Sequence, residues 1–329
     1  MKYPLTRLRR TRSHVAIRSL NSETTLLPKD LIQPIFITDA EKQKEAIATL
    51  PNVYRLGEKD LLELAEQCCA CGVNAIALFP NIPTHRKSEK GEEAYNPSGL
   101  VQRRVQILRK NFPELAIICD VALDPYTTHG HDGILTSAGV IDNDATIEVL
   151  IKQSLSLVHA GAQIIAPSDM MDGRIGAIRA ALEREGHSDI LILSYAAKYA
   201  SSLYGPFRDA SGSNTQLRGA SKKTYQMNFA NRREALLEAR LDIEEGADMI
   251  MVKPALPYLD IIADLSKEFE TPIYAYQVSG EYAMIAFGAQ AGAFTIHDML
   301  VETLTSIKRA GARAIISYGA LTIAQLLSK

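Results

Sequence analysis

The stretch EGADMIMVKP, residues 245–254, contains the pattern that decides the fold. A segment of helical periodicity ends at a glycine, two spacer residues follow, and four apolar residues then lead into Lys253. Glycine suits the left-handed position just after a helix C-terminus. A continuous apolar run is typical of a strand in a parallel sheet that is covered on both faces. The stretch therefore predicts a helix followed by a buried parallel strand.

The same pattern recurs in CGVNAIALFP from Cys71, AGAQIIAPSD from Ala160 and AGARAIISYG from Ala310. Four further strand-like runs are LIQPIFIT from Leu31, LAIICDVAL from Leu115, ILILSYAAK from Ile190 and PIYAYQVSG from Pro272. Segments of helical period separate most of these runs, for example residues 58–70, 145–159 and 232–245.

Eight alternating strand–helix units predict an α/β protein with a (β/α)8 TIM barrel. We expect residues 31–329 to form one catalytic barrel, and residues 1–30 to form an N-terminal arm. An open, doubly wound sheet is the alternative. However, the sequence has no glycine-rich dinucleotide loop and no phosphate-binding loop, which are typical of nucleotide-binding open sheets.

Composition excludes several classes of protein. The formal net charge of −2 argues against a general nucleic-acid-binding protein. No apolar run approaches the roughly 18 residues of a membrane span, and no signal peptide is evident, so we expect a cytoplasmic protein without a membrane partner. Three of the four cysteines lie in CCAC, residues 68–71. They fit small buried residues in a reducing compartment, and a metal cluster is the alternative.

The N-terminal segment is basic. It contains Arg7, Arg9, Arg10 and Arg12 and no acidic residue before Glu23. A targeting peptide or a nucleic-acid-binding arm could have this composition. We favour an arm that extends along another subunit, because arginines on a solvated segment need acidic partners more than they need a groove to bind in.

Reactive side chains follow the predicted strands, where the active face of such a barrel lies. They are Asp120, Asp124, Ser168, Asp169, Tyr195, Lys198, Lys253, Gln277, Ser279, Ser317 and Tyr318. Lys198 and Lys253 leave consecutive strands, so their amines should converge. Mutual repulsion and poor solvation both lower lysine pKa values. A neutral lysine attacks ketones and aldehydes to form a Schiff base.

Two loops add charge to this face. Residues 199–228 are rich in Ser and Gly and are typical of a lid, and their cations suit an anionic substrate such as a carboxylate. The cations are Arg208, Arg218, Lys222 and Lys223. The loop CDVALDPYTTHGHDG, residues 119–133, contains His129, His131 and Asp132. These could bind a divalent ion or only build a hydrogen-bonded loop.

The sequence resembles the porphobilinogen synthase (δ-aminolevulinic acid dehydratase) family over nearly its whole length. The specific segments are SYAAKYASSLYGPFRDA, APSDMMDGRIGAIR, MVKPALPYLD and YQVSGEYAM. The resemblance implies a (β/α)8 barrel with an N-terminal arm that assembles as a homo-octamer. It also implies condensation of two 5-aminolevulinate molecules into porphobilinogen, with loss of two waters, on the route to haem and other tetrapyrroles.

The resemblance assigns roles to individual residues. Lys253 would hold the substrate that supplies the propionate side of the product, and Lys198 the substrate that supplies the acetate side. The first carboxylate would be bound by Ser279 and Tyr318, and the second by Arg208 and Lys222. Many relatives have arginine at position 222, so a point charge replaces a bidentate group. Supporting positions are Asp120, Asp124, Ser168, Tyr195, Tyr204, Phe207 and Gln277.

The resemblance also bears on metals. Zinc-dependent members carry three cysteines where this sequence has Ala122, Asp124 and Asp132. The chain therefore resembles the aspartate-rich, magnesium-responsive branch, in which an allosteric Mg²⁺ lies at the position of Glu238. We expect no zinc and no organic cofactor, and the residues leave open whether Asp124 and Asp132 bind an ion.

Two other functions fit parts of the pattern. A class I aldolase also uses a barrel lysine, but it has no use for Lys198 beside Lys253. A non-catalytic regulatory relative would have lost one of the reactive groups, and none is missing.

Overall fold

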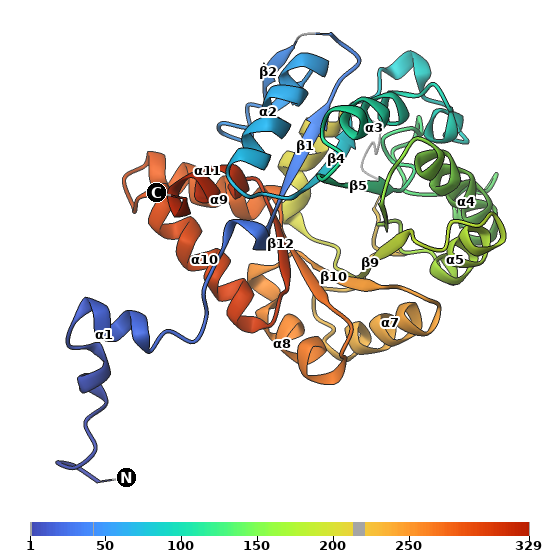
Figure 1. Ribbon diagram of the computed structural model, residues 1–329. Coiled ribbons are helices and arrows are strands. Elements are labelled where there is room, and N and C mark those ends of the chain that lie inside the picture. Colours follow the sequence, from blue (N-terminus) through green and yellow to red (C-terminus); the bar gives the residue numbers. More distant parts are fainter. Residues whose placement is uncertain (1, 42, 213–220, 329) are drawn as a thin grey trace.

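A computed structural model describes residues 2–41, 43–212 and 221–328, and its centre is a closed barrel of eight parallel strands (Figure 1). These strands are β1 (Leu31–Ile37), β4 (Ala75–Pro80), β5 (Ala116–Val121), β8 (Ile164–Pro167), β9 (Leu191–Lys198), β10 (Met249–Lys253), β11 (Ile273–Gln277) and β12 (Ala314–Ser317). They pair in this order, and β12 returns to β1 with Leu31 opposite Ile315. The barrel prediction is confirmed, and the open sheet is excluded.

Helices cover the outside of the strands (Figure 1). They are α2 (Glu58–Ala70), α3 (Leu100–Asn111), α4 (Asn143–His159), α5 (Arg174–Arg184), α7 (Arg233–Glu244), α8 (Leu259–Glu268), α10 (Ile296–Ala310) and α11 (Ala320–Leu327). Each buries one stripe against the barrel; in α10 the buried residues are Leu300, Leu304 and Ile307. Within the described ranges, no helix combines the length and the apolar character needed to cross a bilayer.

The four glycines of the repeated pattern have the predicted conformation. Gly72, Gly161, Gly246 and Gly311 all have positive φ, between 77° and 124°. After α7, for example, the backbone N–H of Ala247 donates to Asp242 O at 2.9 Å, which closes the helix end. Only glycine takes this conformation without a Cβ penalty, and each turn sends the chain directly into a barrel strand.

Several elements, most of them short, were not predicted from the sequence. They are α6 (Gly205–Ser211), α9 (Ser279–Gln290), the strands β2 (Lys44–Ala46), β3 (Tyr54–Leu56), β6 (Ile134–Leu135) and β7 (Ile141–Asp142), and the 3-10 turns η2 (Pro28–Asp30), η3 (Thr84–Arg86), η4 (Glu92–Tyr95), η5 (Ser202–Tyr204) and η6 (Leu256–Tyr258). Most are too short for a periodic pattern to develop. The α6 helix lies in the segment expected to be an irregular lid, and Pro206 at its first turn favours a helix start.

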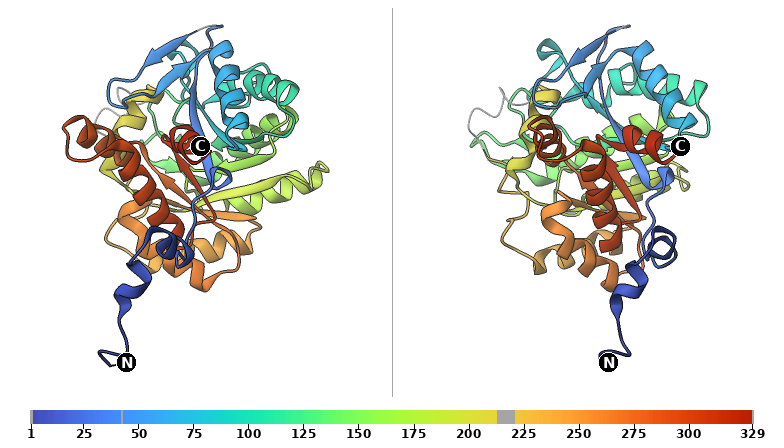
Figure 2. Two further views of the ribbon diagram at one scale, coloured as in Figure 1. Left: turned by 60° about the vertical axis from the view of Figure 1, so that its left-hand side comes forward. Right: turned by 90° about the vertical axis from the view of Figure 1, so that its left-hand side faces the viewer.

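The segment before β1 projects away from the barrel (Figures 1 and 2). It contains the turn η1 (Leu8–Arg12) and the short helix α1 (Val15–Leu20), and neither has a buried residue. Large apolar side chains are exposed along it, including Leu5 and Leu20, which are more than four-fifths exposed. Such a stretch of exposed apolar side chains is typical of an interaction surface.

Candidate active site

The C-terminal ends of the strands open into a cavity of about 610 Å³. Both lysines are the last residues of their strands, and the register of β9 and β10 places Lys253 beside Lys198. The predicted site residues that line the cavity are Asp120, Asp124, Asp132, Ser168, Lys198, Tyr204, Phe207, Arg208, Lys222 and Lys253. The expected convergence of the two lysines at one end of the barrel is confirmed.

Lys253 lies in an aromatic environment. Its Nζ is 4.9–5.2 Å from the ring centroids of Tyr195, Tyr204, Phe207 and Tyr276. Burial, reinforced by repulsion from a second ammonium group nearby, lowers the pKa of Lys253 to about 7. The apolar strand that leads into this residue thus has a chemical consequence. A large fraction of the amine is neutral, and therefore nucleophilic, at neutral pH.

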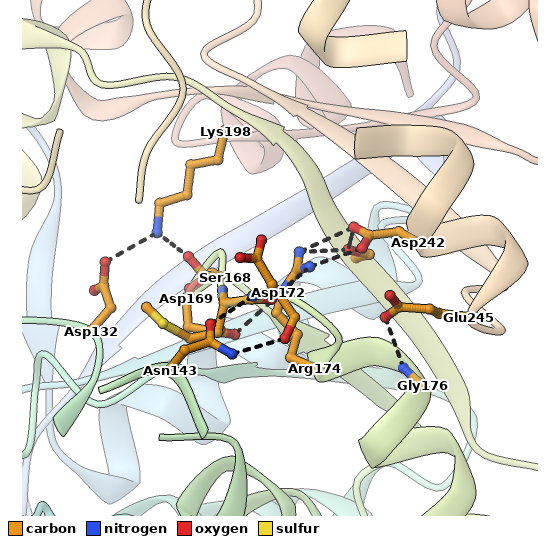
Figure 3. Close-up of polar contacts among 12 residues, drawn as sticks. Asp132, Asn143, Ser168, Asp169, Asp172, Arg174, Gly176, Lys198, Asp242 and Glu245 are labelled. Atoms are coloured by element: carbon orange, nitrogen blue, oxygen red, sulfur yellow. Dashed lines mark hydrogen bonds and ion pairs between the residues drawn. The ribbon is translucent and has the colours of Figure 1, made fainter. Parts of the chain in front are cut away.

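Lys198 has a polar environment instead. Its ammonium group donates a short hydrogen bond to the backbone carbonyl of Ser168 and lies 3.8 Å from Oδ2 of Asp132 (Figure 3). The two amines therefore differ in kind although they end neighbouring strands. One is surrounded by rings, and the other is held by a carbonyl and a carboxylate.

Asp120 interacts electrostatically with both lysines. Burial raises its pKa to about 6, and the positive charges of Lys253 and Lys198 oppose this rise. The hydroxyl of Ser168 also stabilises the carboxylate. A carboxyl group with a pKa near the working pH is suited to take up and return protons.

Lys222 is not free above the cavity, which differs from the expected arrangement of the lid. Its Nζ donates to Asp132 Oδ1 at 2.8 Å and to Asp124 Oδ2 at 3.2 Å. Burial would lower the pKa of Lys222, but the two carboxylates raise it above its usual value. Burial would likewise raise the pKa of Asp132, but Lys198 and Lys222 hold it well below its usual range. The proposed ion-binding position at Asp124 and Asp132 is thus filled by an ammonium group.

Arg208 remains available to an anion. It lies on α6 and lines the cavity, and its Nε is buried without a hydrogen-bond partner among the described residues. A buried donor without a partner is costly, so a carboxylate that enters the cavity would gain by pairing with it. The other predicted lid cation, Arg218, lies outside the described residues.

Four other predicted residues lie behind the cavity wall. The hydroxyl of Ser279 accepts from Phe207 N at 3.0 Å and donates to a loop carbonyl, and Tyr318 shares a 3.0 Å hydrogen bond with Tyr276. Tyr195 contacts Lys253 through its ring. Gln277 accepts a hydrogen bond from Ser317 and donates to Thr303. The structure therefore does not bring Ser279 and Tyr318 to the cavity surface, and their carboxylate-binding role stays a prediction.

Arg174 was not identified from the sequence. It is buried and makes two hydrogen bonds to Asp242, at 2.8 and 3.1 Å, and its Nε lies 3.7 Å from Asp169 (Figure 3). Burial raises the pKa of Asp169 to about 6, against the pull of Arg174. The guanidinium therefore fixes the turn after β8, which includes the Ser168 carbonyl that contacts Lys198. The only available signal was that Asp169 and Arg174 share the segment APSDMMDGRIGAIR.

Glu281 is a second residue that the sequence did not reveal. It is fully buried, and its carboxylate accepts hydrogen bonds from the backbone N–H groups of Leu256, Val278 and Ala255 at 2.6, 2.6 and 3.2 Å. Burial raises its pKa to about 7, while these hydrogen bonds pull in the opposite direction. Glu281 thereby ties the loop after Lys253 to the junction of β11 and α9.

The predicted magnesium ligand Glu238 lies on α7, outside the cavity lining. Burial raises its pKa to about 7; Arg174 opposes the rise, and the nearby acids Asp242, Asp172 and Glu234 add to it. An oxygen-rich group of this kind suits Mg²⁺, since a divalent cation would relieve the repulsion among the carboxylates. The residues therefore fit the ion, which would act away from the lysines.

The two histidines of the loop after β5 are engaged locally. Nδ1 of His131 lies 3.1 Å from the Tyr225 hydroxyl, and Nε2 of His129 lies 3.2 Å from the Glu89 carbonyl. Burial lowers the pKa of both imidazoles. These contacts favour the hydrogen-bonded loop over an ion site.

The CCAC segment gives no thiolate cluster. The thiols of Cys68, Cys69 and Cys71 are free. Cys68 is buried in the core, whereas Cys69 is exposed, so the side chains lie on different faces at the end of α2. The arrangement favours small core residues over the alternative of a metal cluster.

The fold and the cavity together define a class of protein, a (β/α)8-barrel enzyme with two lysine amines at the ends of neighbouring strands. Comparison with known proteins narrows this class. The family model for delta-aminolevulinic acid dehydratase matches residues 5–326. The chain belongs to the delta-aminolevulinic acid dehydratase family, the enzymes that condense two molecules of 5-aminolevulinate into porphobilinogen.

Individual relatives agree with this assignment. The chloroplastic delta-aminolevulinic acid dehydratase of Physcomitrium patens is 50% identical over 98% of this chain and 74% of its own length. The Bradyrhizobium diazoefficiens enzyme is 48% identical over 98% of this chain and 90% of its own length. The Toxoplasma gondii enzyme, whose crystal structure contains the product porphobilinogen, superposes with a TM-score of 0.95 at 46% identity, covering 98% of this chain and 91% of that one.

Proposed function

We propose that Lys253 and Lys198 carry out the family reaction by forming Schiff bases with the two 5-aminolevulinate molecules. The observation that carries the proposal is that the two amines lie side by side in one cavity and that the pKa of Lys253 is lowered to about 7. The presence of two such amines also argues against an aldolase, which needs only one. The retention of both lysines and a cavity speaks against a non-catalytic relative.

The chemistry follows from the two environments. The lone pair of neutral Lys253 attacks the ketone carbon of one substrate, and the resulting carbinolamine loses water to leave an imine. The ammonium group of Lys198, which donates to the Ser168 carbonyl and lies near Asp132, must first lose a proton before its nitrogen can attack the second ketone. Asp120, with a pKa of about 6 and close electrostatic coupling to both amines, is placed to accept and return protons.

Substrate carboxylates would be bound at the cavity wall and behind it. Arg208 offers a buried Nε that has no hydrogen-bond partner in the described part of the chain, and we assign it to the second carboxylate together with Lys222. For Lys222 this assignment requires that the substrate carboxylate compete with Asp124 and Asp132 for the ammonium group. We assign Ser279 and Tyr318 to the first carboxylate, which would have to displace the hydrogen bonds that their hydroxyls make to Phe207 N and to the Tyr276 hydroxyl.

Reductive trapping tests the two Schiff bases directly. The purified chain is incubated with 5-aminolevulinate, reduced with borohydride, digested and analysed by mass spectrometry. Adducts are expected on peptides that contain Lys253 and Lys198, and Lys253→Met should abolish turnover. Lys223→Met is the matched control, because Lys223 also lines the cavity but lies on an exposed loop. Full turnover by Lys253→Met, or an adduct on Lys223 alone, would refute the assignment.

We also propose that Mg²⁺ at Glu238 stimulates the enzyme allosterically and that zinc has no place in the cavity. The oxygen-rich surroundings of Glu238 support the first part. The second is supported by Ala122, Asp124 and Asp132, which offer no thiolate, and by the Lys222 ammonium between the two carboxylates. The four free thiols fit a reducing compartment such as the cytoplasm.

Finally, we propose that residues 1–30 are an arm for subunit contacts, that residues 31–329 are the catalytic barrel, and that the chain assembles as a homo-octamer. The exposed apolar side chains of the arm support this, since they gain by burial against a second copy. Deleting the arm should lower the mass of the particle in sedimentation. An unchanged mass would refute its role in assembly.

A further inference from the structure

A group of three side chains with metal-binding chemistry lies at the other end of the barrel from the cavity. Helices run antiparallel to the strands of such a barrel, so the C-terminal ends of α4 and α5 lie near the starts of β8 and β9. His159 is the last residue of α4, and Glu185 and His187 follow the last turn of α5. The two helices pack side by side (Figure 1).

The three side chains converge on one point. One ligand atom from each lies within 4.8 Å of the others, and Nε2 of His159 is 3.6 Å from Oε2 of Glu185. The rings of His159 and His187 are 5.1 Å apart between centroids and stand at 66° to each other. The two imidazole rings are therefore inclined to each other rather than stacked, and a nitrogen of each lies close to the carboxylate.

The local backbone fixes two of the three. Gly186 has a φ of 80°, and the N–H of His187 donates to Leu182 O at 2.9 Å, which closes the end of α5. This turn places Glu185 and His187 on either side of Gly186, whose left-handed backbone conformation is favourable for glycine because it has no Cβ. The third ligand is brought in by the packing of α4 on α5, so the group exists only in the folded chain.

The chemistry of the ligands selects the class of ion. Two imidazole nitrogens and one carboxylate oxygen match Zn²⁺ and its neighbours Co²⁺, Ni²⁺ and Cu²⁺, whereas Mg²⁺ prefers oxygen alone. Tetrahedral zinc, with bonds of about 2.0–2.1 Å, needs ligand atoms about 3.4 Å apart. His159 and Glu185 are exposed enough to close that gap by rotating their side chains. The negative ends of two helix dipoles also face the position of the cation.

We propose that His159, Glu185 and His187 form a surface site for a divalent cation of borderline softness. Zn²⁺ is the ion used to test it, and water would fill the fourth coordination position. The bound ion clamps the C-terminal ends of α4 and α5. The site is separate from the lysine cavity and from Glu238. Zinc that stays with the purified chain would therefore sit here, and its removal would leave turnover intact.

Zinc and cobalt binding test the site. The metal-free full-length protein is titrated with Zn²⁺ by calorimetry and with Co²⁺ by absorption spectroscopy, for wild type and for His159→Ala, His187→Ala and Glu185→Gln. Loss of either imidazole should weaken zinc binding by at least about tenfold. The cobalt spectrum should lose its nitrogen-ligand features. Turnover should be unchanged in all three variants, which also shows that they fold.

A control variant and a stability measurement complete the design. His297→Ala removes an exposed helical histidine outside this group and should leave zinc affinity unchanged. Zinc should raise the melting temperature of wild type but not of the double variant His159→Ala/His187→Ala, because only a ligand that binds the folded state stabilises it. Unaltered zinc binding by the double variant would overturn the proposal. So would a wild-type Kd weaker than about 1 mM.

Discussion

The pH dependence of imine formation at Lys253 is the sharpest test of how the barrel activates an amine. A pKa of about 7 makes the neutral fraction about 10% at pH 6, half at pH 7 and about 90% at pH 8. The rate of attack on a ketone should follow this fraction. It should rise about tenfold from pH 6 to pH 8 and then level off.

The assay uses 4-oxopentanoate, which has the ketone and carboxylate of 5-aminolevulinate but no amine that titrates. Protein and ketone are mixed at each pH, reduced after a fixed short time, and the adduct on the Lys253 peptide is quantified by mass spectrometry. An ordinary lysine, with a pKa of about 10.4, would show a tenfold rise for every pH unit up to pH 9. A tenfold rise between pH 8 and pH 9 would therefore refute the argument.

Two variants test the cause of the shift, because they should move the midpoint in opposite directions. The ammonium of Lys198 lowers the pKa of Lys253, so Lys198→Met should shift the profile to higher pH. The carboxylate of Asp120 raises that pKa, so Asp120→Asn should shift the profile to lower pH. Lys223→Met is the control and should leave the midpoint in place. Shifts of the same sign would show that the charges named here do not control the amine.

Three further predictions concern other parts of the molecule. Arg208→Ala removes one charge-assisted contact of roughly 1.5–3 kcal/mol; it should raise KM for 5-aminolevulinate more than it lowers kcat, and an unchanged KM in steady-state assays would count against the carboxylate role. Arg174→Met leaves the buried carboxylates of Asp169 and Asp242 without their cation, so the free energy of unfolding measured in urea should fall by about 3–5 kcal/mol. A fall below about 1 kcal/mol would mean that this ion-pair network does not stabilise the fold. Glu238→Ala should abolish stimulation by Mg²⁺ while the activity without added Mg²⁺ persists, and a preserved response in a magnesium titration would place the ion elsewhere.

Much of the site could be predicted because a barrel converts sequence position into spatial position. Any residue that ends a barrel strand lies at the same end of the molecule, so Lys198 and Lys253 could be placed together from their positions alone. The fold was accessible for a similar reason. The glycine turns and continuous apolar strands are local patterns, and each is imposed by backbone sterics and burial within a few residues.

Charge pairing could not be predicted in this way. Lys222 pairs with Asp124 and Asp132, which precede it by 98 and 90 positions, and nothing in its own segment indicates these partners. The rings around Lys253 come from β9, the lid and β11.

The sequence by itself therefore determined the strands, the helix ends and the residues that reach the active end of the barrel. Only the tertiary structure decided which lysine amine has a lowered pKa and which is held by a carbonyl and a carboxylate. It also decided where Arg174 and Glu281 anchor the loops, and it brought His159 next to His187. The physical reason is the distance over which each kind of interaction acts. Hydrogen-bonded turns and burial patterns are set by neighbours along the chain, whereas a pKa or a ligand set depends on every charge and dipole within a few ångströms through space.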